Sequence, residues 1–180
     1  MLEQENIEYT YVMLKPDGVQ KGLLGEVINR FLQASLTVNY VKEFSMTEEQ
    51  VCEHYAHLLE KPFFPVLASF MLSGPVISMI VSGPDAILKV RTLMGSTDSK
   101  EANPGTIRGD YGDKTCCTYN IIHGSDGKES AIAEIMRFYP ELSITEFYPE
   151  QNQLEKIGRQ KMKKYQKKET NRKKYCIMKM

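Results

Sequence analysis

The segment from Val76 to Val81 constrains the fold most strongly, because it is an almost wholly apolar run between two turn sequences. Ser73-Gly74-Pro75 precedes the run, and Gly83-Pro84-Asp85 follows it. A short apolar run bounded by glycine and proline predicts a strand that is buried in the middle of a sheet. We therefore expect the chain to build its core around a β-sheet.

Hydrophobic periodicity predicts further strands and helices around this run. Strands are expected at 9–14, at 36–44 and in a short segment ending at His123; helices are expected at 24–32, 47–58, 86–94 and 126–138, with another ending near Leu72. Thr47 with Gln50, and Asp126 with Glu129, have the spacing of capping boxes that start two of these helices. The order β-α-β-α-α-β-α-β-α contains two βαβ-like halves. It predicts an α+β fold, a ferredoxin-like sandwich in which a four-stranded antiparallel sheet carries helices on one face.

Length and composition indicate an ordinary globular domain. The 180 residues suffice for one domain with a substantial core. No apolar run approaches the roughly 20 residues that cross a bilayer, and the acidic N-terminus lacks the basic and apolar regions of a signal peptide. The four cysteines lack zinc-finger spacing. We expect a cytoplasmic protein without a membrane span.

The C-terminal segment differs in charge from the rest of the chain. Residues 151–180 contain 11 Lys and Arg against 2 Glu, a net charge of +9, so the neutral total leaves −9 on residues 1–150. We predict one domain at 1–149 and a basic C-terminal extension at 150–180. Such a segment is typically a solvated or disordered face, and contact with nucleic acid, a membrane surface or another subunit is the alternative.

The stretch from Asn120 to Asp126 is the first candidate site. Ile121 and Ile122 predict a short buried strand, and Gly124 predicts a tight turn after His123. An imidazole between a strand end and a helix N-terminus lies close to free backbone donors, which favour phosphate or another anion. The alternative is a hydrogen-bonded structural histidine.

His54 and His57 are three residues apart on the predicted helix 47–58. A metal site is conceivable at that spacing, but the sequence places no third ligand. We expect these two histidines to face solvent or to be hydrogen-bonded, and we predict no protein-held metal.

Polar residues at strand ends and in the aperiodic segment from Gly95 to Thr115 complete a candidate site. A loop of this length inside a compact domain is uncommon unless it is functional or mobile. The set comprises Lys15, Arg91, Thr97, Arg108, Asn120 and His123. Three cations, a hydroxyl, an amide and an imidazole suit a phosphate cradle rather than a protease or glycosidase site. The sequence has neither a G-x-S-x-G serine elbow nor the phosphate loop G-x-x-x-x-G-K-[ST].

These residues lie within a pattern that resembles the nucleoside diphosphate kinase family. The matching segments are Lys15-Pro16-Asp17-Gly18, His54-Tyr55, Pro62-Phe63-Phe64, Ser73-Gly74-Pro75, Arg91 to Thr97, Pro104 to Asp110 and Asn120 to Asp126. The resemblance runs in unbroken order from about Tyr9 to Phe138. Its blocks N-I-I-H-G-S-D and P-G-T-I-R-G-D are highly specific.

The resemblance implies a ping-pong reaction in which a nucleoside triphosphate phosphorylates His123 and a nucleoside diphosphate then takes the phosphoryl group. Mg²⁺ is implied as a cofactor bound through the nucleotide phosphates, and a homo-oligomer, hexameric or tetrameric, is implied as the assembly. By position, Lys15, Arg91, Thr97 and Arg108 match phosphate binders, Phe63 matches a base-stacking ring, and Asn120 with Lys15 matches the groups at the sugar 3′-hydroxyl. Tyr55 matches a tyrosine beside the histidine, Glu134 the glutamate that orients the imidazole, and Ser125 a nearby hydroxyl.

Some positions depart from the family pattern. Lys61 stands where arginine is common, Gly127 where serine is common, and the segment between Asp110 and Asn120 is about two residues longer than in common members. Two other functions remain as alternatives: an RNA-binding sheet, although the RNA-recognition motif is absent, and a catalytically weak scaffold that binds nucleic acid or a partner through its basic extension.

Overall fold

A four-stranded sheet forms the centre of the computed structural model, which describes residues 7–149. The strands are β1 (Ile7–Leu14), β2 (Thr37–Phe44), β3 (Val76–Pro84) and β4 (Ile122–Gly124), in the order β2-β3-β1-β4. Each neighbouring pair is antiparallel. The predicted four-stranded antiparallel sheet and its ferredoxin-like topology are confirmed.

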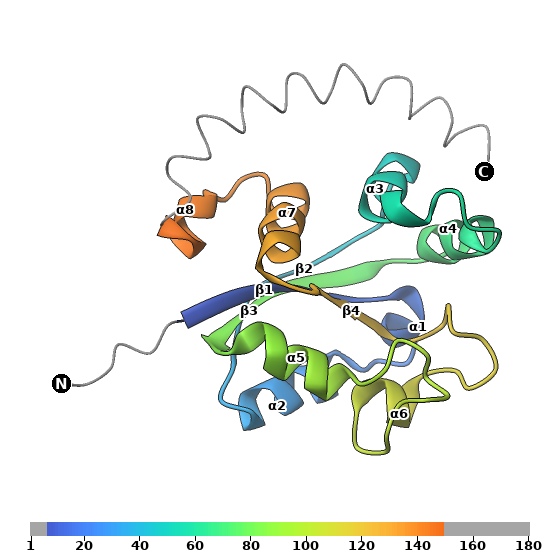
Figure 1. Ribbon diagram of the computed structural model, residues 1–180, viewed down its shortest axis with the longest axis horizontal. Coiled ribbons are helices and arrows are strands. Elements are labelled where there is room, and N and C mark those ends of the chain that lie inside the picture. Colours follow the sequence, from blue (N-terminus) through green and yellow to red (C-terminus); the bar gives the residue numbers. More distant parts are fainter. Residues whose placement is uncertain (1–6, 150–180) are drawn as a thin grey trace.

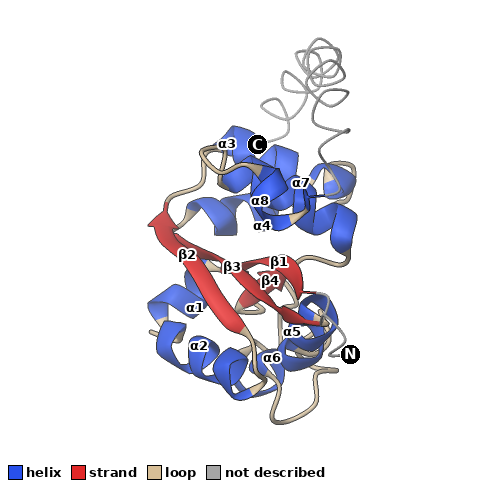
Figure 2. Ribbon diagram, turned by 90° about the vertical axis from the view of Figure 1, so that its left-hand side faces the viewer, coloured by secondary structure: helices blue, strands red, loops and turns tan. Residues whose placement is uncertain are grey.

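Helices cover both faces of this sheet (Figures 1 and 2). One face carries α3 (Glu48–His54), α4 (Phe64–Leu72), α7 (Lys128–Phe138) and α8 (Ile144–Phe147); the other carries α1 (Pro16–Gln20), α2 (Leu24–Gln33), α5 (Ala86–Met94) and α6 (Ile107–Tyr111). The expectation of helices on one face is therefore wrong.

The alternation of side chains along the central strands explains the two covered faces. Tyr11 and Met13 belong to one hydrophobic cluster, whereas Val12 and Leu14 belong to a second one. Successive side chains of a strand point to opposite faces, so an apolar residue at every position requires cover on both sides. The apolar run at Val76–Val81 has the same property, and every residue of β3 before Pro84 is buried.

Of the two capping boxes predicted from the sequence, the structure confirms one. The capping box of α3 is confirmed: Gln50 N donates to Thr47 Oγ1 at 3.2 Å, and Thr47 N donates to Gln50 Oε1 at 3.0 Å. The capping box at Asp126 is wrong, because α7 begins after Gly127 with no side-chain cap. Asp126 forms an ion pair with Arg91 instead, at 2.7 Å. The ion pair with Arg91 therefore replaces the predicted hydrogen bond between the Asp126 carboxylate and the backbone at the start of α7.

Three helices, α1, α6 and α8, were not expected from the periodicity, and each has only four or five residues. A helix of one turn is too short to show a period of 3.6. Within residues 7–149, no helix has the length and apolar character needed to cross a membrane. The predicted basic extension at 150–180 lies outside the described residues.

Candidate functional site

The site begins at the edge strand β4, which pairs with β1 so that His123 lies opposite Met13. Ile121, just before the strand, has φ 72°, a conformation that costs energy for a β-branched residue. Two hydrogen bonds fix its peptide groups: Lys15 N donates to Ile121 O at 2.8 Å, and Ile121 N donates to the Asp17 carboxylate at 3.0 Å. The start of α1 therefore sets the backbone that leads into His123.

A carboxylate on α7 orients the imidazole of His123. His123 Nε2 lies 2.9 Å from Glu134 Oε1, and Ser125 Oγ donates to Glu134 Oε2 at 2.5 Å. Ser125 is fully buried and is itself held by the backbone of Tyr11, whose N–H donates to Ser125 Oγ at 3.3 Å. A carboxylate accepts hydrogen bonds, so Nε2 carries the proton of the neutral ring. The lone pair of the imidazole is then on Nδ1.

Lys15, Asn120 and Thr97 form a connected chain beside this imidazole. Lys15 Nζ donates to Asn120 Oδ1 at 2.7 Å, and Asn120 Nδ2 donates to the Thr97 carbonyl at 2.9 Å. Lys15 and Asn120 are buried, whereas Thr97 is exposed. Burial, with the charge of nearby Arg108 adding to it, lowers the pKa of Lys15 to about 8. The fold thus holds an ammonium group with little hydration and few neutralising partners, which favours an anionic ligand.

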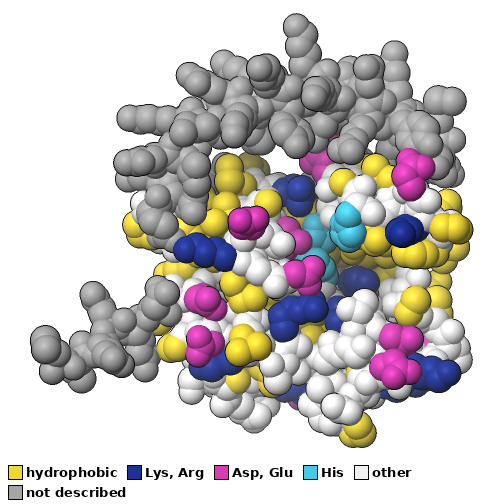
Figure 3. Space-filling model, viewed as in Figure 1, with side chains coloured by type: hydrophobic (Ala, Val, Ile, Leu, Met, Phe, Trp, Pro, Cys, Tyr) yellow, Lys and Arg dark blue, Asp and Glu magenta, His cyan; other side chains and the backbone are white. Residues whose placement is uncertain are grey.

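Two arginines extend the positive charge toward α5. The buried Arg108 donates from Nη2 to the Ile122 carbonyl at 2.8 Å and from Nη1 to the Gly95 carbonyl at 3.1 Å. Burial lowers its pKa to about 10, and the charge of Arg91 contributes to the shift. Arg108 therefore remains a cation at neutral pH. Histidine side chains and neighbouring Lys and Arg side chains appear together on one face in Figure 3.

Two aromatic candidates lie on the helical layer that faces this cluster. Tyr55 follows α3 and is 6 % exposed; its hydroxyl has no hydrogen-bond partner among residues 7–149. Burial, with the charge of Glu134 adding to it, raises the pKa of Tyr55 far above its usual range. Phe63 caps the start of α4 and is 48 % exposed. An exposed ring of this kind has a free face on which a planar group can stack.

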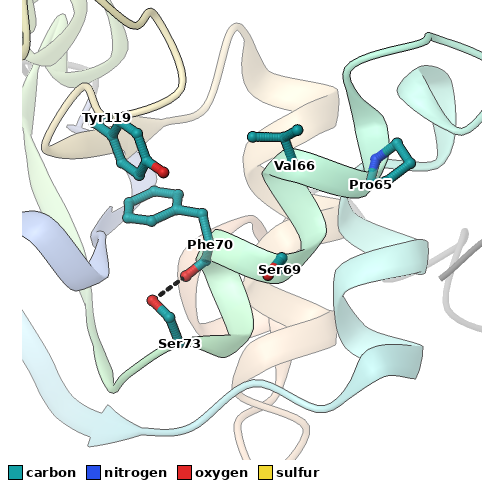
Figure 4. A pocket seen from close by; sticks show the side chains of 6 residues that line it. All are labelled: Pro65, Val66, Ser69, Phe70, Ser73 and Tyr119. Atoms are coloured by element: carbon teal, nitrogen blue, oxygen red, sulfur yellow. Dashed lines mark hydrogen bonds between the residues drawn. The ribbon is translucent and has the colours of Figure 1, made fainter.

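A shallow hollow of about 440 Å³ lies along α4 (Figure 4). Its walls include Phe70 and Tyr119, whose rings meet edge to face at 4.6 Å. Lys15 Nζ lies 5.9 Å from the centre of the Phe70 ring. The hollow therefore opens beside the buried lysine.

His54 was expected to face solvent or to be hydrogen-bonded, and both expectations are wrong for this residue. Its side chain is 1 % exposed, and neither ring nitrogen has a hydrogen-bond partner among the described residues. The α-helix ends at His54, and His57 belongs to a separate 3₁₀ turn at Ala56–Leu58. His57 is exposed, as expected. The spacing of Val51, His54 and Leu58 along one helical stripe was the available signal for burial.

Asp17 is a second residue that the analysis of single positions missed. Its carboxylate accepts from Ile121 N and from Gly18 N, the latter at 3.0 Å. Burial raises the pKa of Asp17, while the hydrogen bond from Ile121 opposes that rise. The role of Asp17 depends on contact with a segment far away in the sequence, so local patterns do not reveal it.

Solved structures show which proteins share this arrangement. A nucleoside diphosphate kinase from Halobacterium salinarum, solved in complex with CDP, is 47% identical, with a TM-score of 0.70 over 74% of this chain and 88% of that one. The apo enzyme from Encephalitozoon cuniculi is 39% identical, with a TM-score of 0.69 over 73% and 88%. The fold is that of a nucleotide-binding kinase.

Sequence comparisons specify the family. A family model described as nucleoside diphosphate kinase matches residues 8–144. A nucleoside diphosphate kinase of Symbiobacterium thermophilum is 47% identical over 137 residues, which cover 76% of this chain and 89% of that protein. One from Acetivibrio thermocellus is 46% identical over 136 residues, covering 76% and 98%. The chain belongs to the nucleoside diphosphate kinase family, as its motifs predicted. These matches identify an enzyme and give no support to the scaffold alternative.

Proposed function

We propose that this chain transfers the γ-phosphoryl group of a nucleoside triphosphate to a nucleoside diphosphate through a phosphohistidine at Nδ1 of His123. The contact that carries the proposal is the one between His123 Nε2 and Glu134 Oε1 at 2.9 Å. It fixes the tautomer and leaves the Nδ1 lone pair available to attack phosphorus. The CDP in the halobacterial relative supports a nucleoside diphosphate as one of the two substrates.

In the first half-reaction, Nδ1 forms a bond to the γ-phosphorus while the bond from phosphorus to the β,γ-bridging oxygen breaks. The diphosphate takes the electron pair of that bond and leaves. The ring becomes cationic, and Glu134, supported by Ser125, stabilises the positive charge through the Nε2 proton. In the second half-reaction, a terminal oxygen of the incoming diphosphate attacks phosphorus and the N–P bond breaks, which restores the neutral imidazole.

Positioning and charge neutralisation account for most of the catalysis of phosphoryl transfer. We assign phosphate binding to Lys15, Arg91, Arg108 and Thr97, contact with the sugar 3′-hydroxyl to Lys15 and Asn120, and base stacking to Phe63. The hydrogen bond between Lys15 and Asn120 supports their shared role. The buried hydroxyl of Tyr55, which has no hydrogen-bond partner in the part of the chain that the structure describes, supports a contact with the ligand. A stacked ring accepts any base, because every base has an apolar face, so we propose broad nucleoside specificity.

The carboxylates of the site fit Mg²⁺ carried on the nucleotide better than Mg²⁺ held by the protein. Glu134 is engaged by His123 and Ser125, Asp17 by two backbone N–H groups, and Asp126 by Arg91. Mg²⁺ in phosphate-transfer sites typically takes phosphate oxygens and water, with few protein ligands. We propose Mg²⁺ bound through the nucleotide phosphates, where it would neutralise charge on the transferred group.

The test is to incubate the protein with γ-labelled ATP, measure acid-labile label on the protein, and then add a nucleoside diphosphate. We expect label that is chased into the new triphosphate, and none on His123→Ala. The exposed His57→Ala is the matched control and should label like the natural sequence. Label that survives His123→Ala, or that cannot be chased, would contradict the proposal.

A further inference from the structure

The buried imidazole of His54 lacks an explanation in the reaction described above. Both of its nitrogens lie out of solvent without a hydrogen-bond partner among residues 7–149. Leaving a buried polar group unpaired costs about 1–3 kcal/mol, and buried side-chain polar atoms are in the large majority hydrogen-bonded. A neutral imidazole with a free nitrogen is the form that binds metal ions.

The surroundings of His54 supply two more ligands. Its Nδ1 lies 3.7 Å from Glu134 Oε1, and the same oxygen lies 2.9 Å from His123 Nε2. The rings of His54 and His123 are nearly perpendicular, with centres 4.5 Å apart. One ligand atom from each of the three residues lies within 4.8 Å of the others. Two ligands on a tetrahedral Zn²⁺ with bonds of about 2.0–2.1 Å are about 3.4 Å apart, so movements of well under 2 Å close this site.

We propose that His54, His123 and Glu134 form a binding site for Zn²⁺ or a similar divalent transition metal, and that metal in this site inhibits the enzyme. Two imidazoles and one carboxylate leave a fourth position open to water, as in other three-ligand zinc sites. Two imidazole nitrogens and one carboxylate do not suit Mg²⁺, because Mg²⁺ prefers oxygen ligands and near-octahedral geometry. The site is therefore distinct in chemistry from a metal on the nucleotide.

Inhibition follows from the tautomer of His123. Metal binding needs the lone pair of Nε2, so the proton that Nε2 carries in the free enzyme moves to Nδ1 of the same ring. Nδ1 then has no lone pair with which to attack phosphorus. Glu134 is drawn to the metal at the same time and no longer stabilises charge on the ring. This consequence rests on the proposed role of His123, whereas the metal site itself does not.

Imidazole nitrogen spectra of the natural sequence test the site without measuring activity. The chain has 3 histidines, so ¹⁵N-histidine labelling gives three ring systems, and His57→Ala assigns the exposed one. We expect Zn²⁺, added to nucleotide-free protein, to shift the His54 and His123 signals together at one equivalent while His57 stays unchanged. The proposal is overturned if Zn²⁺ shifts only the His57 signals or leaves the His54 signals unshifted. Zinc bound at Cys116 or Cys117 instead would leave the His54 signals unshifted.

A matched pair of variants then measures affinity. We expect His54→Leu, which keeps a similar volume without nitrogens, to weaken Zn²⁺ binding by more than about tenfold, because even residues that only orient a ligand change affinity by 10–100-fold. His57→Ala should bind like the natural sequence. Equal affinity of His54→Leu and the natural sequence overturns the site, and if His54→Leu does not fold, the spectra above still decide. Zinc should also block labelling by ATP, reversibly with a chelator; full labelling with the site occupied overturns the inhibition alone.

Discussion

The burial of Lys15 opposes the positive charge that its assigned role in phosphate binding requires. Its ammonium group is needed as a cation for phosphate, yet burial lowers its pKa from the usual 10.5 to about 8. Among the described residues, the hydrogen bonds to Asn120 and to the Thr118 carbonyl and the charge of Asp17 compensate in part for the lost water. Bound phosphate would supply the missing negative charge and raise the pKa again. Substrate affinity and protonation of Lys15 are therefore coupled.

The first prediction concerns the pH dependence of kcat/KM, which reports the free enzyme. We expect kcat/KM to fall as pH rises through about 8, because neutral Lys15 binds phosphate poorly. Lys15→Arg should shift this fall to higher pH, although the larger guanidinium lowers the plateau. The unfolding free energy should move in the opposite direction: it decreases as pH falls from 10.5 to about 8, where only the unfolded chain takes up the proton. A fall in kcat/KM that Lys15→Arg leaves in place would assign it to another group.

Glu134 carries the second prediction. Glu134→Gln keeps the shape of the side chain and an oxygen for His123 Nε2, but it removes the negative charge that stabilises the cationic phosphorylated ring. We expect the rate of phosphorylation in a single turnover to fall on the order of 10²-fold, within the range for a positioned acid–base group. Affinity for a nucleoside diphosphate should change little. Comparable losses in rate and affinity would show instead that the substitution disturbs the whole site.

At the scale of single residues, the family motifs mark positions that the fold brings together, and the roles assigned to them stay predictions. The structure brings Lys15 to Asn120, Asn120 to Thr97, and Glu134 to His123. Asp17 was not assigned a role, and His54 was expected in the wrong environment. Their roles depend on contacts with Ile121 and Glu134, more than 75 positions away in the sequence. The sequence next to Asp17 or His54 does not show that distant segments bury these residues.

At the scale of elements, the short helix α6 shows how an aperiodic segment becomes ordered. Its N-cap Thr106 accepts a hydrogen bond from Gly109 N at 3.1 Å and donates one to the Asn103 carbonyl at 2.6 Å. Arg30 on α2 pairs with Asp110 at 2.8 Å. These contacts hold the helix that carries Arg108, whose guanidinium donates to the carbonyl of Ile122, the residue before His123. The segment was expected to be a loop, and the structure places the helix α6 within it, which depends on its caps rather than on periodicity.

Gly109 provides the third prediction. A Cβ built at Gly109 would lie 1.9 Å from the Asn103 carbonyl oxygen, a backbone atom that cannot move aside alone. We expect Gly109→Ala to lower the unfolding free energy by about 1–3 kcal/mol, the usual range for overpacking, and to weaken nucleotide binding by displacing Arg108. Gly25→Ala on α2 is the matched control, since a Cβ there meets nothing within 4 Å. It should be neutral or slightly stabilising, because alanine favours helices. Chemical denaturation of both variants decides the matter.

At the scale of the whole molecule, the two-sided sheet explains why His123 is both rigid and reachable. β1 lies between β3 and β4 and is covered on both faces, so its partner strand β4 inherits a fixed position. β4 itself is an edge strand of three residues, and the imidazole on it remains 21 % exposed. The sequence predicted the central strand correctly. The prediction of helices on one face was wrong because β1 and β3 carry apolar side chains on both faces. Assembly into a homo-oligomer, a cytoplasmic location and the domain boundary at 149 stay predictions.

The last prediction tests that boundary. The described chain closes its core with Ile144, Phe147 and Tyr148, all buried on the same face as α7, and the assigned catalytic residues precede them. A chain ending at Pro149 should therefore fold and keep phosphoryl transfer within about twofold of the full chain, while its association, measured by light scattering, should differ from that of the full chain. A chain ending at Ser143 is the matched control. It loses three buried side chains, each contributing about 1.5–3 kcal/mol by burial, so it should unfold at much lower denaturant. Loss of folding in the longer truncation product would instead place part of the structural core beyond residue 149.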